Sequence, residues 1–578
     1  MQAASAATAQ NAAADVLDYD PIALEIIWSR LNAIADEAAS ILLRSSFSTI
    51  IREAHDYACV LMDADGNSLA ESSVTVPAFN ATLPRTMGYF LEKYPKDTWR
   101  EGDIVITNDP WKGTGHLPDF TLAVPIFRKG KLVAFAGSIA HLSDIGGTLL
   151  GADTKEVYEE GLCIPILKLA SEGRINEDVI EILKTNVRIP HVVMGDLYAQ
   201  IAGAEACVER LLALMDEYDL DSLDTVSAIT QRLAEEAMRA AIRKIPEGTY
   251  RHEVHTDGYG EPLVVKVAVT IKDGEMLIDF AGSSPQVDRG AINCPTCYGF
   301  AYSAYSIKCA IDPTTPKNQG SFRPLKFSAP LGTIVNPRPP AAVNARHLTG
   351  HILTSAIYGA LKQAIPRQVV AECGGQPNLR AQFSGTDKDD RRFVYMLFGS
   401  GGMGARPDRD GLHCTPFPSN SIFGSVESIE NFAPLIFWRK EMPADSGGAG
   451  QYRGGCGQQL LIQYAGSKPG VVSFRADRLE HPARGYFGGL DGAPTRLRLF
   501  RGKVGEPPVC TSEQGEPVNP KGQTRLVPGD TLEVVFPGGG GYGSPLERDP
   551  ASVEADLESG IITSRAAADL YQRKAAKA

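Results

Sequence analysis

Two apolar runs joined by a short turn are the feature of this chain that most constrains its fold. The runs cover 121–127 and 132–139, and the residues between them include a glycine. Runs of this kind around a glycine-containing turn predict a β-hairpin. Positions just before the first strand then face positions just after the second. We therefore expect His116 and Asp119 to meet His141 at the open end of the hairpin.

These three side chains have the chemistry of a metal site. Two imidazoles and a carboxylate that converge from loop positions on a rigid scaffold can bind a divalent ion. The alternative is a pair of structural histidines held by hydrogen bonds. The chain has only 10 histidines, and two of them at one hairpin mouth beside an aspartate favour the metal site.

The length of 578 residues is too great for one ordinary core. We expect two to four domains that form one body, with an α+β fold. The predicted division is a disordered tail at 1–17, a metal-binding catalytic region at 18–200 and a helical and mixed α/β core region at 201–440. A Gly-rich, β-rich module with a helical tail follows at 441–578.

Charge and hydropathy exclude some classes of partner. The net charge is −12, and no Lys/Arg run is long enough to follow a phosphate backbone, so we expect no nucleic-acid surface. No stretch approaches the roughly 18 apolar residues of a membrane span. The first residues lack the basic and apolar segments of a signal peptide. We expect a cytoplasmic protein with no membrane partner.

The ten cysteines are scattered, apart from the pair Cys294 and Cys297. A single CxxC without a second pair is a weak signal for zinc or redox chemistry. The residues that follow it resemble the start of a helix that packs small side chains. We therefore interpret this pair as structural, with reduced thiols.

The pattern of apolar residues predicts the remaining elements. Helices are expected at 22–51, 179–187, 196–219, 222–244, 293–310, 348–364 and 552–575. An apolar strand is expected at 55–62, with Asp56 at its entrance. Alternation from 248 to 280 predicts strands, and short strands are expected over 457–536. The Gly-rich segments 399–405, 445–450 and 537–544 are interpreted as tight turns that need positive φ.

Several ordered motifs resemble one known family. They are Asn108-Asp109-Pro110, GHLPD at 115–119, HLSDIGG at 141–147, EGLCIP at 160–165, GSFRP at 320–324, and the Gly-rich blocks at 445–455 and 538–543. Together they are similar to the hydantoinase B/oxoprolinase family, the beta subunits of ATP-dependent cyclic-amide hydrolases of the N-methylhydantoinase, caprolactamase and 5-oxoprolinase type. The resemblance covers nearly the whole chain after the tail.

The resemblance implies a complete ligand set. By motif, two histidines and two aspartates would hold the metal, namely Asp56, His116, Asp119 and His141. Nitrogen and oxygen ligands of this kind suit zinc, manganese or iron. Asp56 by itself would be interpreted as a turn or capping residue, and only the resemblance makes it a ligand.

Further polar residues are candidates for supporting roles. Asp144, and Asn108 or Asp109, are expected directly behind the ligands, where they would orient imidazole N–H groups. Asp144 has the alternative role of capping the following turn. Glu160 could contact substrate or shuttle a proton, although an ion pair is the expected use.

The family also implies a partner. A hydantoinase A-type alpha subunit, an actin-like ATPase, would bind ATP and phosphorylate the amide oxygen, and the beta subunit would add metal-bound water to the activated carbon. This chain has no Walker A pattern, and we interpret the similarity of 144–148 to the phosphate loop of actin-like ATPases as accidental. It is similar to the second half of a full-length oxoprolinase, so we expect a hetero-oligomer, α2β2 or higher.

Two other functions stay open at this point. Acetone and acetophenone carboxylases resemble the same family, so the chain could be a subunit of an ATP-dependent ketone carboxylase. It could also be a non-catalytic scaffold that completes an ATPase subunit. Ring-opened product from a cyclic amide would favour the first function. Bicarbonate-dependent ATP hydrolysis with a ketone would favour the second.

Overall fold

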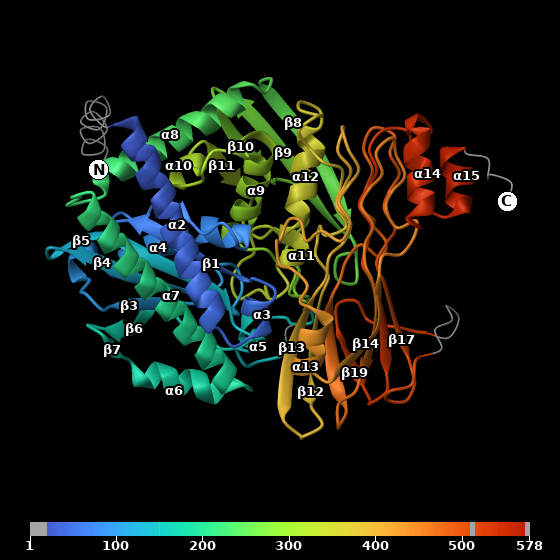
Figure 1. Ribbon diagram of the computed structural model, residues 1–578, viewed down its shortest axis with the longest axis horizontal. Coiled ribbons are helices and arrows are strands. Elements are labelled where there is room, and N and C mark those ends of the chain that lie inside the picture. Colours follow the sequence, from blue (N-terminus) through green and yellow to red (C-terminus); the bar gives the residue numbers. More distant parts are fainter. Residues whose placement is uncertain (1–19, 150, 509–514, 573–578) are drawn as a thin grey trace.

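The computed structural model describes residues 20–149, 151–508 and 515–572. The tail expected at 1–17 lies outside these ranges. Four β-sheets with flanking helices build the described chain (Figure 1). The α+β class expected from the sequence is confirmed.

The first sheet carries the predicted hairpin. Its strand order is β2-β1-β5-β4-β3-β6-β7. The bounds are Tyr57–Asp63 (β1), Ser68–Glu71 (β2), Ile104–Thr107 (β3), Asp119–Arg128 (β4), Lys131–His141 (β5), Leu167–Ser171 (β6) and Arg174–Ile175 (β7). Strands β4 and β5 are antiparallel, and Asp119 pairs with His141 in the register. The predicted hairpin and its open end are therefore confirmed.

Helices cover both faces of this sheet. Helices α2 (Pro21–Ser45) and α7 (Pro190–Glu217) pack on one face, and α4 (Pro77–Lys93) packs on the other (Figure 1). All seven residues of β1 are buried, as expected for a strand with both faces covered. Tyr57 and Leu61 belong to the core on the α2 side, whereas Val60 belongs to the core on the α4 side. Successive side chains of a strand point to opposite faces of the sheet, so they alternate between the two cores.

The second sheet has four strands. Its order is β11-β10-β9-β8, with β8 at Gly248–Thr256, β9 at Leu263–Lys272, β10 at Glu275–Asp279 and β11 at Leu325–Ser328. The other helices here are α3 (Thr49–Arg52), α5 (Val157–Glu160), α6 (Glu177–Asn186), α8 (Asp224–Arg243), α9 (Thr296–Ile311), α10 (Gln319–Phe322), α11 (His347–Gly350) and α12 (Ile352–Leu361).

The alternation predicted for the strands of 248–280 is confirmed, because Val265, Val267 and Val269 are buried. The helix predicted at 348–364 is instead two helices, α11 and α12.

Two further sheets pack against each other in the C-terminal part. One has the order β13-β12-β16-β19, and the other has the order β14-β15-β20-β17-β18. Their bounds are Arg380–Thr386 (β12), Arg392–Phe398 (β13), Leu435–Glu441 (β14), Gln459–Tyr464 (β15), Gly470–Arg475 (β16), Arg496–Phe500 (β17), Glu516–Pro517 (β18), Gln523–Leu526 (β19) and Thr531–Val535 (β20). Short strands over 457–536 are confirmed. Strands β12, β13 and β14 were not expected, and α13 (Val426–Phe432) precedes β14.

The Gly-rich segments are not the tight turns expected from the sequence. Within 399–405, 445–450 and 537–544, Gly543 is the one glycine with positive φ. The segments are hydrogen-bonded to one another: Gly402 N donates to Pro537 O at 2.9 Å, and Gly448 N donates to Gly539 O at 2.8 Å. A Cβ at Gly402 would lie 1.8 Å from Gly455 O. Close approach of backbones, not a left-handed conformation, requires glycine here.

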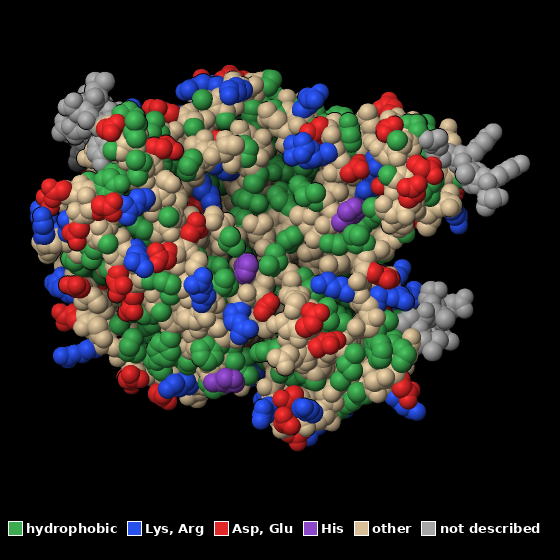
Figure 2. Space-filling model, in the orientation of Figure 1, with side chains coloured by type: hydrophobic (Ala, Val, Ile, Leu, Met, Phe, Trp, Pro, Cys, Tyr) green, Lys and Arg blue, Asp and Glu red, His purple; other side chains and the backbone are tan. Residues whose placement is uncertain are grey.

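The predicted C-terminal helix 552–575 is two helices, α14 (Pro550–Glu558) and α15 (Ser564–Tyr571), and its last residues lie outside the described ranges. Within those ranges, no helix has the length and apolar character needed to cross a membrane. Acidic and basic side chains are interspersed on the face shown in Figure 2, without a continuous basic stripe.

Candidate metal centre

Three of the four predicted ligands come from neighbouring strands of the first sheet. Asp56 immediately precedes β1, His141 ends β5 and Asp119 begins β4, and these strands are adjacent in the order β1-β5-β4. The backbone N–H of His141 donates to Asp56 O at 3.0 Å. These three adjacent strands therefore hold the side chains together at one end of the strands.

The fourth, His116, lies on the loop that enters β4. Its Nε2 lies 2.8 Å from Asp119 Oδ1, and the same oxygen lies 2.8 Å from His141 Nδ1. Donor atoms of these three residues all lie within 4.8 Å of one another. Asp56 Oδ2 lies 3.9 Å from His141 Nδ1. The structure thus brings His116, Asp119 and His141 together and places Asp56 beside His141.

The donor set fits a divalent ion. Zinc–nitrogen and zinc–oxygen bonds are about 2.0–2.2 Å long, so two donors less than about 4.2 Å apart can share one ion. The contacts of 2.8 Å between Asp119 and each imidazole, and of 3.9 Å between Asp56 and His141, meet this limit. His116 Nε2 and Asp56 Oδ2 are buried and have no hydrogen-bond partner. Buried polar atoms are normally partnered, and an ion would provide the missing partner. Zinc, manganese and iron all accept such ligands.

Electrostatics favour the ligating forms of Asp119 and His116. Burial opposes ionisation of Asp119, but its interactions with His116 and Arg346 outweigh burial and hold the Asp119 pKa well below its usual range. Burial, followed by the charge of Arg346, holds the pKa of His116 well below its usual range. A carboxylate and a neutral imidazole are the forms that bind metal.

Two residues that the sequence analysis missed position these ligands. Arg346 Nη2 donates to Asp119 Oδ2 at 2.7 Å, and its guanidinium lies 3.9 Å from the centroid of the Tyr298 ring. His116 Nδ1 lies 3.2 Å from Asn344 O, which accepts its N–H and leaves Nε2 free. No spacing in the sequence connects these partners, which are more than 200 residues from the hairpin.

The residues expected directly behind the ligands have other partners. Asp144 forms an ion pair with Arg188 at 2.6 Å and accepts from the N–H of Gly146, so it serves the following turn. Asn108 binds the backbone of Leu117, Leu162 and Ile164. Asp109 accepts from the N–H of Trp111. These contacts replace the expected bonds to imidazole, because the loops place the side chains against backbone groups.

Glu160 supports the centre through the backbone instead of through the expected ion pair. Its Oε1 accepts from the N–H groups of Val343 and Asn344 at 2.8 and 2.9 Å, and from Thr154 Oγ1 at 2.9 Å. Oε2 is buried without a partner. Burial raises the pKa of Glu160 to about 7. Glu160 thus holds the backbone of Asn344, whose carbonyl orients the His116 ring.

This pKa predicts a pH dependence of stability. Glu160 has an ordinary pKa of 4.5 that rises to about 7 in the folded chain, so the folded state binds more protons between these values. The free energy of unfolding should therefore fall by roughly 3 kcal/mol as pH rises through this window. Glu160→Gln keeps the acceptor oxygen and should flatten the fall. Urea midpoints at both ends of the window test this, with exposed Glu159→Gln as control. An equal fall in both variants would contradict it.

The CxxC pair lies in the core, as the structural interpretation expects. Cys294 and Cys297 are both buried, and the Cys297 thiol donates to Pro110 O at 3.4 Å. Burial raises the pKa of both thiols. Helix α9 begins between them at Thr296. The nine cysteines in the described ranges are all free.

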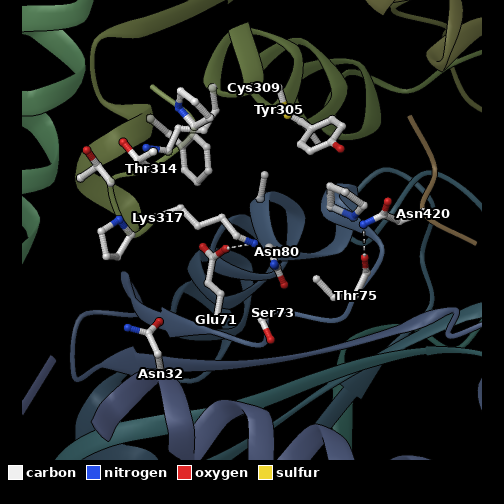
Figure 3. A pocket seen from close by; sticks show the side chains of 18 of the residues that line it. Asn32, Glu71, Ser73, Thr75, Asn80, Tyr305, Cys309, Thr314, Lys317 and Asn420 are labelled. Carbon is white, nitrogen blue, oxygen red and sulfur yellow. Dashed lines mark hydrogen bonds and ion pairs between the residues drawn. The ribbon is translucent and has the colours of Figure 1, made fainter. Parts of the chain in front are cut away.

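A separate cavity of about 460 Å³ lies between α4 and α9 (Figure 3). None of the four candidate ligands lines it. Glu71 and Lys317 form an ion pair at 3.1 Å across it, and the Asn80 amide is buried there without a hydrogen-bond partner. The cavity has room for a small molecule, and its second carboxylate, Asp36, accepts hydrogen bonds from the backbone and hydroxyl of Ser73.

The helix-flanked sheets and the buried His/Asp/His group define an α+β protein with a candidate metal centre at a hairpin end. Its sequence matches the model of one family, hydantoinase B/oxoprolinase, over residues 20–545. The chain belongs to this family.

Two relatives align along nearly their whole length. The chain is 32% identical to a putative D-/L-hydantoinase B subunit from Pseudomonas sp. (strain NS671), covering 95% of this chain and 94% of the relative. It is 30% identical to the caprolactamase beta subunit of Pseudomonas jessenii, covering 94% of each. It is 29% identical to 5-oxoprolinase 1 of Arabidopsis thaliana, of which it covers only 42%.

Solved structures share the fold. The crystal structure of the ATP-dependent caprolactamase from Pseudomonas jessenii matches with a TM-score of 0.88 at 28% identity, over 96% of both chains. A nucleotide-free structure of acetone carboxylase matches with a TM-score of 0.87 at 21% identity, over 96% of this chain and 80% of that one. The match to acetone carboxylase shows a shared fold alone.

Proposed function

We propose that this chain is the beta subunit of an ATP-dependent cyclic-amide hydrolase that opens a hydantoin, 5-oxoproline or a lactam. The observation that carries the proposal is the convergence of His116, Asp119 and His141 on one buried point with Asp56 beside them. Relatives named as hydantoinase and caprolactamase subunits align over 95% and 94% of this chain. Asp56, His116, Asp119 and His141 are proposed as the ligands.

The reaction needs activation, because attack on an unstrained amide costs its resonance and the opened ring recloses easily. Transfer of a phosphoryl group from ATP to the amide oxygen makes the ring carbon a better electrophile. Water adds to this carbon, the ring C–N bond breaks with protonation of the amine, and a second water releases phosphate from the acyl phosphate. One lactam, one ATP and two waters thus give an amino acid, ADP and phosphate.

The residues of this chain prepare the site for water addition. A bound divalent ion would make hydroxide available near neutral pH, because it would lower the pKa of water to about 7. Arg346 and Thr114 bind one oxygen of Asp119 and leave the other facing the imidazoles. Asn344 O holds the His116 ring in one tautomer. Burial of all four ligands excludes bulk water and strengthens these interactions.

ATP is proposed to bind to a partner. The chain contains no Walker A pattern, and two of its relatives are named as single subunits, B and beta, of their enzymes. An alpha subunit of the actin-like ATPase type would phosphorylate the substrate, and the two would form a hetero-oligomer, α2β2 or higher, in the cytoplasm where ATP is available.

The test is co-purification with an alpha subunit and an assay of the complex. ATP hydrolysis should rise on addition of a hydantoin, 5-oxoproline or caprolactam, with ring-opened product detected by mass spectrometry. Neither subunit alone should form product. Bicarbonate-dependent ATP hydrolysis with acetone and no ring opening would instead support a carboxylase. Full activity after removal of all metal would contradict the proposed centre and support a scaffold role.

A further inference from the structure

Two buried arginines face each other across neighbouring strands of the third sheet. Arg380 of β12 pairs with Arg475 of β16 in the antiparallel register. Their side chains are 4% and 0% exposed. Like charges directly opposite on a sheet are destabilising, and buried charges normally have a partner of opposite sign. This pair therefore needs an explanation.

The protein provides too few acceptors for these guanidinium groups. Arg475 Nε and Nη1 are buried without a hydrogen-bond partner, and Nη2 contacts only the sulfur of Met396 at 3.5 Å. Arg380 Nε also has no partner. The nearest carboxylate oxygen to Arg380 is Asp56 Oδ2, 3.9 Å from Nη1. Burial and the charge of Arg380 lower the pKa of Arg475 well below its usual range, as expected for an uncompensated cation.

His347, at the start of α11, adds a third group. Both of its ring nitrogens are buried without a partner. Burial, and then the charges of Arg380 and Arg475, hold the pKa of His347 well below its usual range. A neutral imidazole still offers one N–H donor. Three buried side chains from β12, β16 and α11 thus leave donors unpaired, and the charges of the two arginines act on His347.

This region adjoins the candidate metal centre and carries excess positive charge. Asp56, a proposed ligand, is the carboxylate whose charge reaches both arginines. The other carboxylate, Asp119, is already paired with Arg346. A divalent ion on the ligands would add more positive charge. An oxyanion would satisfy the unpaired donors and balance the charge.

We propose that Arg380, Arg475 and His347 form an anion pocket that holds the phosphoryl oxygens of the activated substrate beside the candidate metal centre. This inference rests on the proposed function. A phosphoryl group has three acceptor oxygens in a tetrahedral arrangement, which suits donors arriving from two guanidinium groups and an imidazole better than a flat carboxylate does. Free phosphate shares this chemistry, because it is the product of the same reaction.

The first experiment measures binding of inorganic phosphate to the full-length chain by calorimetry. The wild type should bind phosphate saturably, and acetate more weakly. Arg475→Met should weaken phosphate binding roughly 10- to 100-fold, since hydrogen bonds to charged groups contribute about that much. Arg525→Met, an exposed arginine of the same sheet, is the matched control and should bind normally. No saturable binding to the wild type, or equal binding by Arg475→Met, would overturn the pocket.

Two further readouts separate binding from misfolding. In phosphate-free buffer Arg475→Met should melt no lower than the wild type, because it removes an unpaired buried charge. Its metal content should be unchanged, and loss of metal would overturn a separate anion role. Arg475→Lys, which keeps the charge, should bind phosphate better than Arg475→Met does.

The complex with the alpha subunit distinguishes the source of the anion. Arg475→Met should form less ring-opened product per ATP hydrolysed than the wild type. If Arg475→Met loses phosphate binding but still forms as much ring-opened product per ATP as the wild type, the pocket does not hold the activated substrate. It would then be a site for released phosphate. If phosphate binds as expected but no cyclic amide is opened, the pocket stands and the proposed function fails.

Discussion

Replacing His116 or His141 by alanine should remove the bound metal and reduce turnover more than 100-fold. Both imidazoles contact Asp119 Oδ1, at 2.8 Å each, so loss of either leaves an incomplete donor set. Loss of an outer-shell partner alone typically costs 10–100-fold in metal affinity or activity, and a direct ligand should cost more. Metal per chain by mass spectrometry and ring opening by the complex measure the two effects.

The matched control is His191→Ala, an exposed histidine in α7. It should keep both metal and activity. Circular dichroism should show that the His116 and His141 variants keep the wild-type secondary structure, because each change removes a ligand and leaves the sheet register intact. A variant of either ligand that keeps full metal content and activity would exclude this centre.

Gly402→Ala should strongly destabilise the chain. The new Cβ would lie 1.8 Å from Gly455 O and 2.7 Å from Gly539 N, both backbone atoms of neighbouring segments. Neither can move without breaking the hydrogen bonds that join the segments. We expect a loss of more than about 4 kcal/mol in the free energy of unfolding, which is exceptional for one substitution.

Gly88→Ala provides the comparison. Gly88 is exposed within α4, and nothing lies within 4 Å of a Cβ built there. Alanine in a helix should stabilise the chain by about 0.5–1 kcal/mol. Urea unfolding of the two variants beside the wild type measures both effects. Equal stability of the two variants would show that backbone contact does not require glycine at position 402.

The hairpin could be predicted from the sequence because its information is local. Two apolar runs around a short turn predict the pairing of β4 with β5, and the register of this pair places Asp119 beside His141. Asp56 was different. It precedes a strand far from the hairpin in sequence, and pairing of β1 with β5 brings it to the site. The family motif, not spacing, selected it.

The roles of the supporting residues could not be predicted. Asp144 and Asn108 follow the motifs closely, yet they bind Arg188 and backbone groups. Arg346 and Asn344, which do contact the ligands, come from a segment more than 200 residues away. Neighbours in sequence share a loop but not a contact, because side chains of adjacent residues point in different directions.

The sequence by itself determined the alternating strands, most of the helices, the hairpin and the residues gathered at its end, since these depend on local periodicity. The tertiary structure decided the rest. It placed Arg346 on Asp119, set Arg380 opposite Arg475, and packed glycine backbones where turns were expected. Such contacts depend on which distant segments meet, and that is set by the packing of the whole core, which no short stretch of sequence encodes.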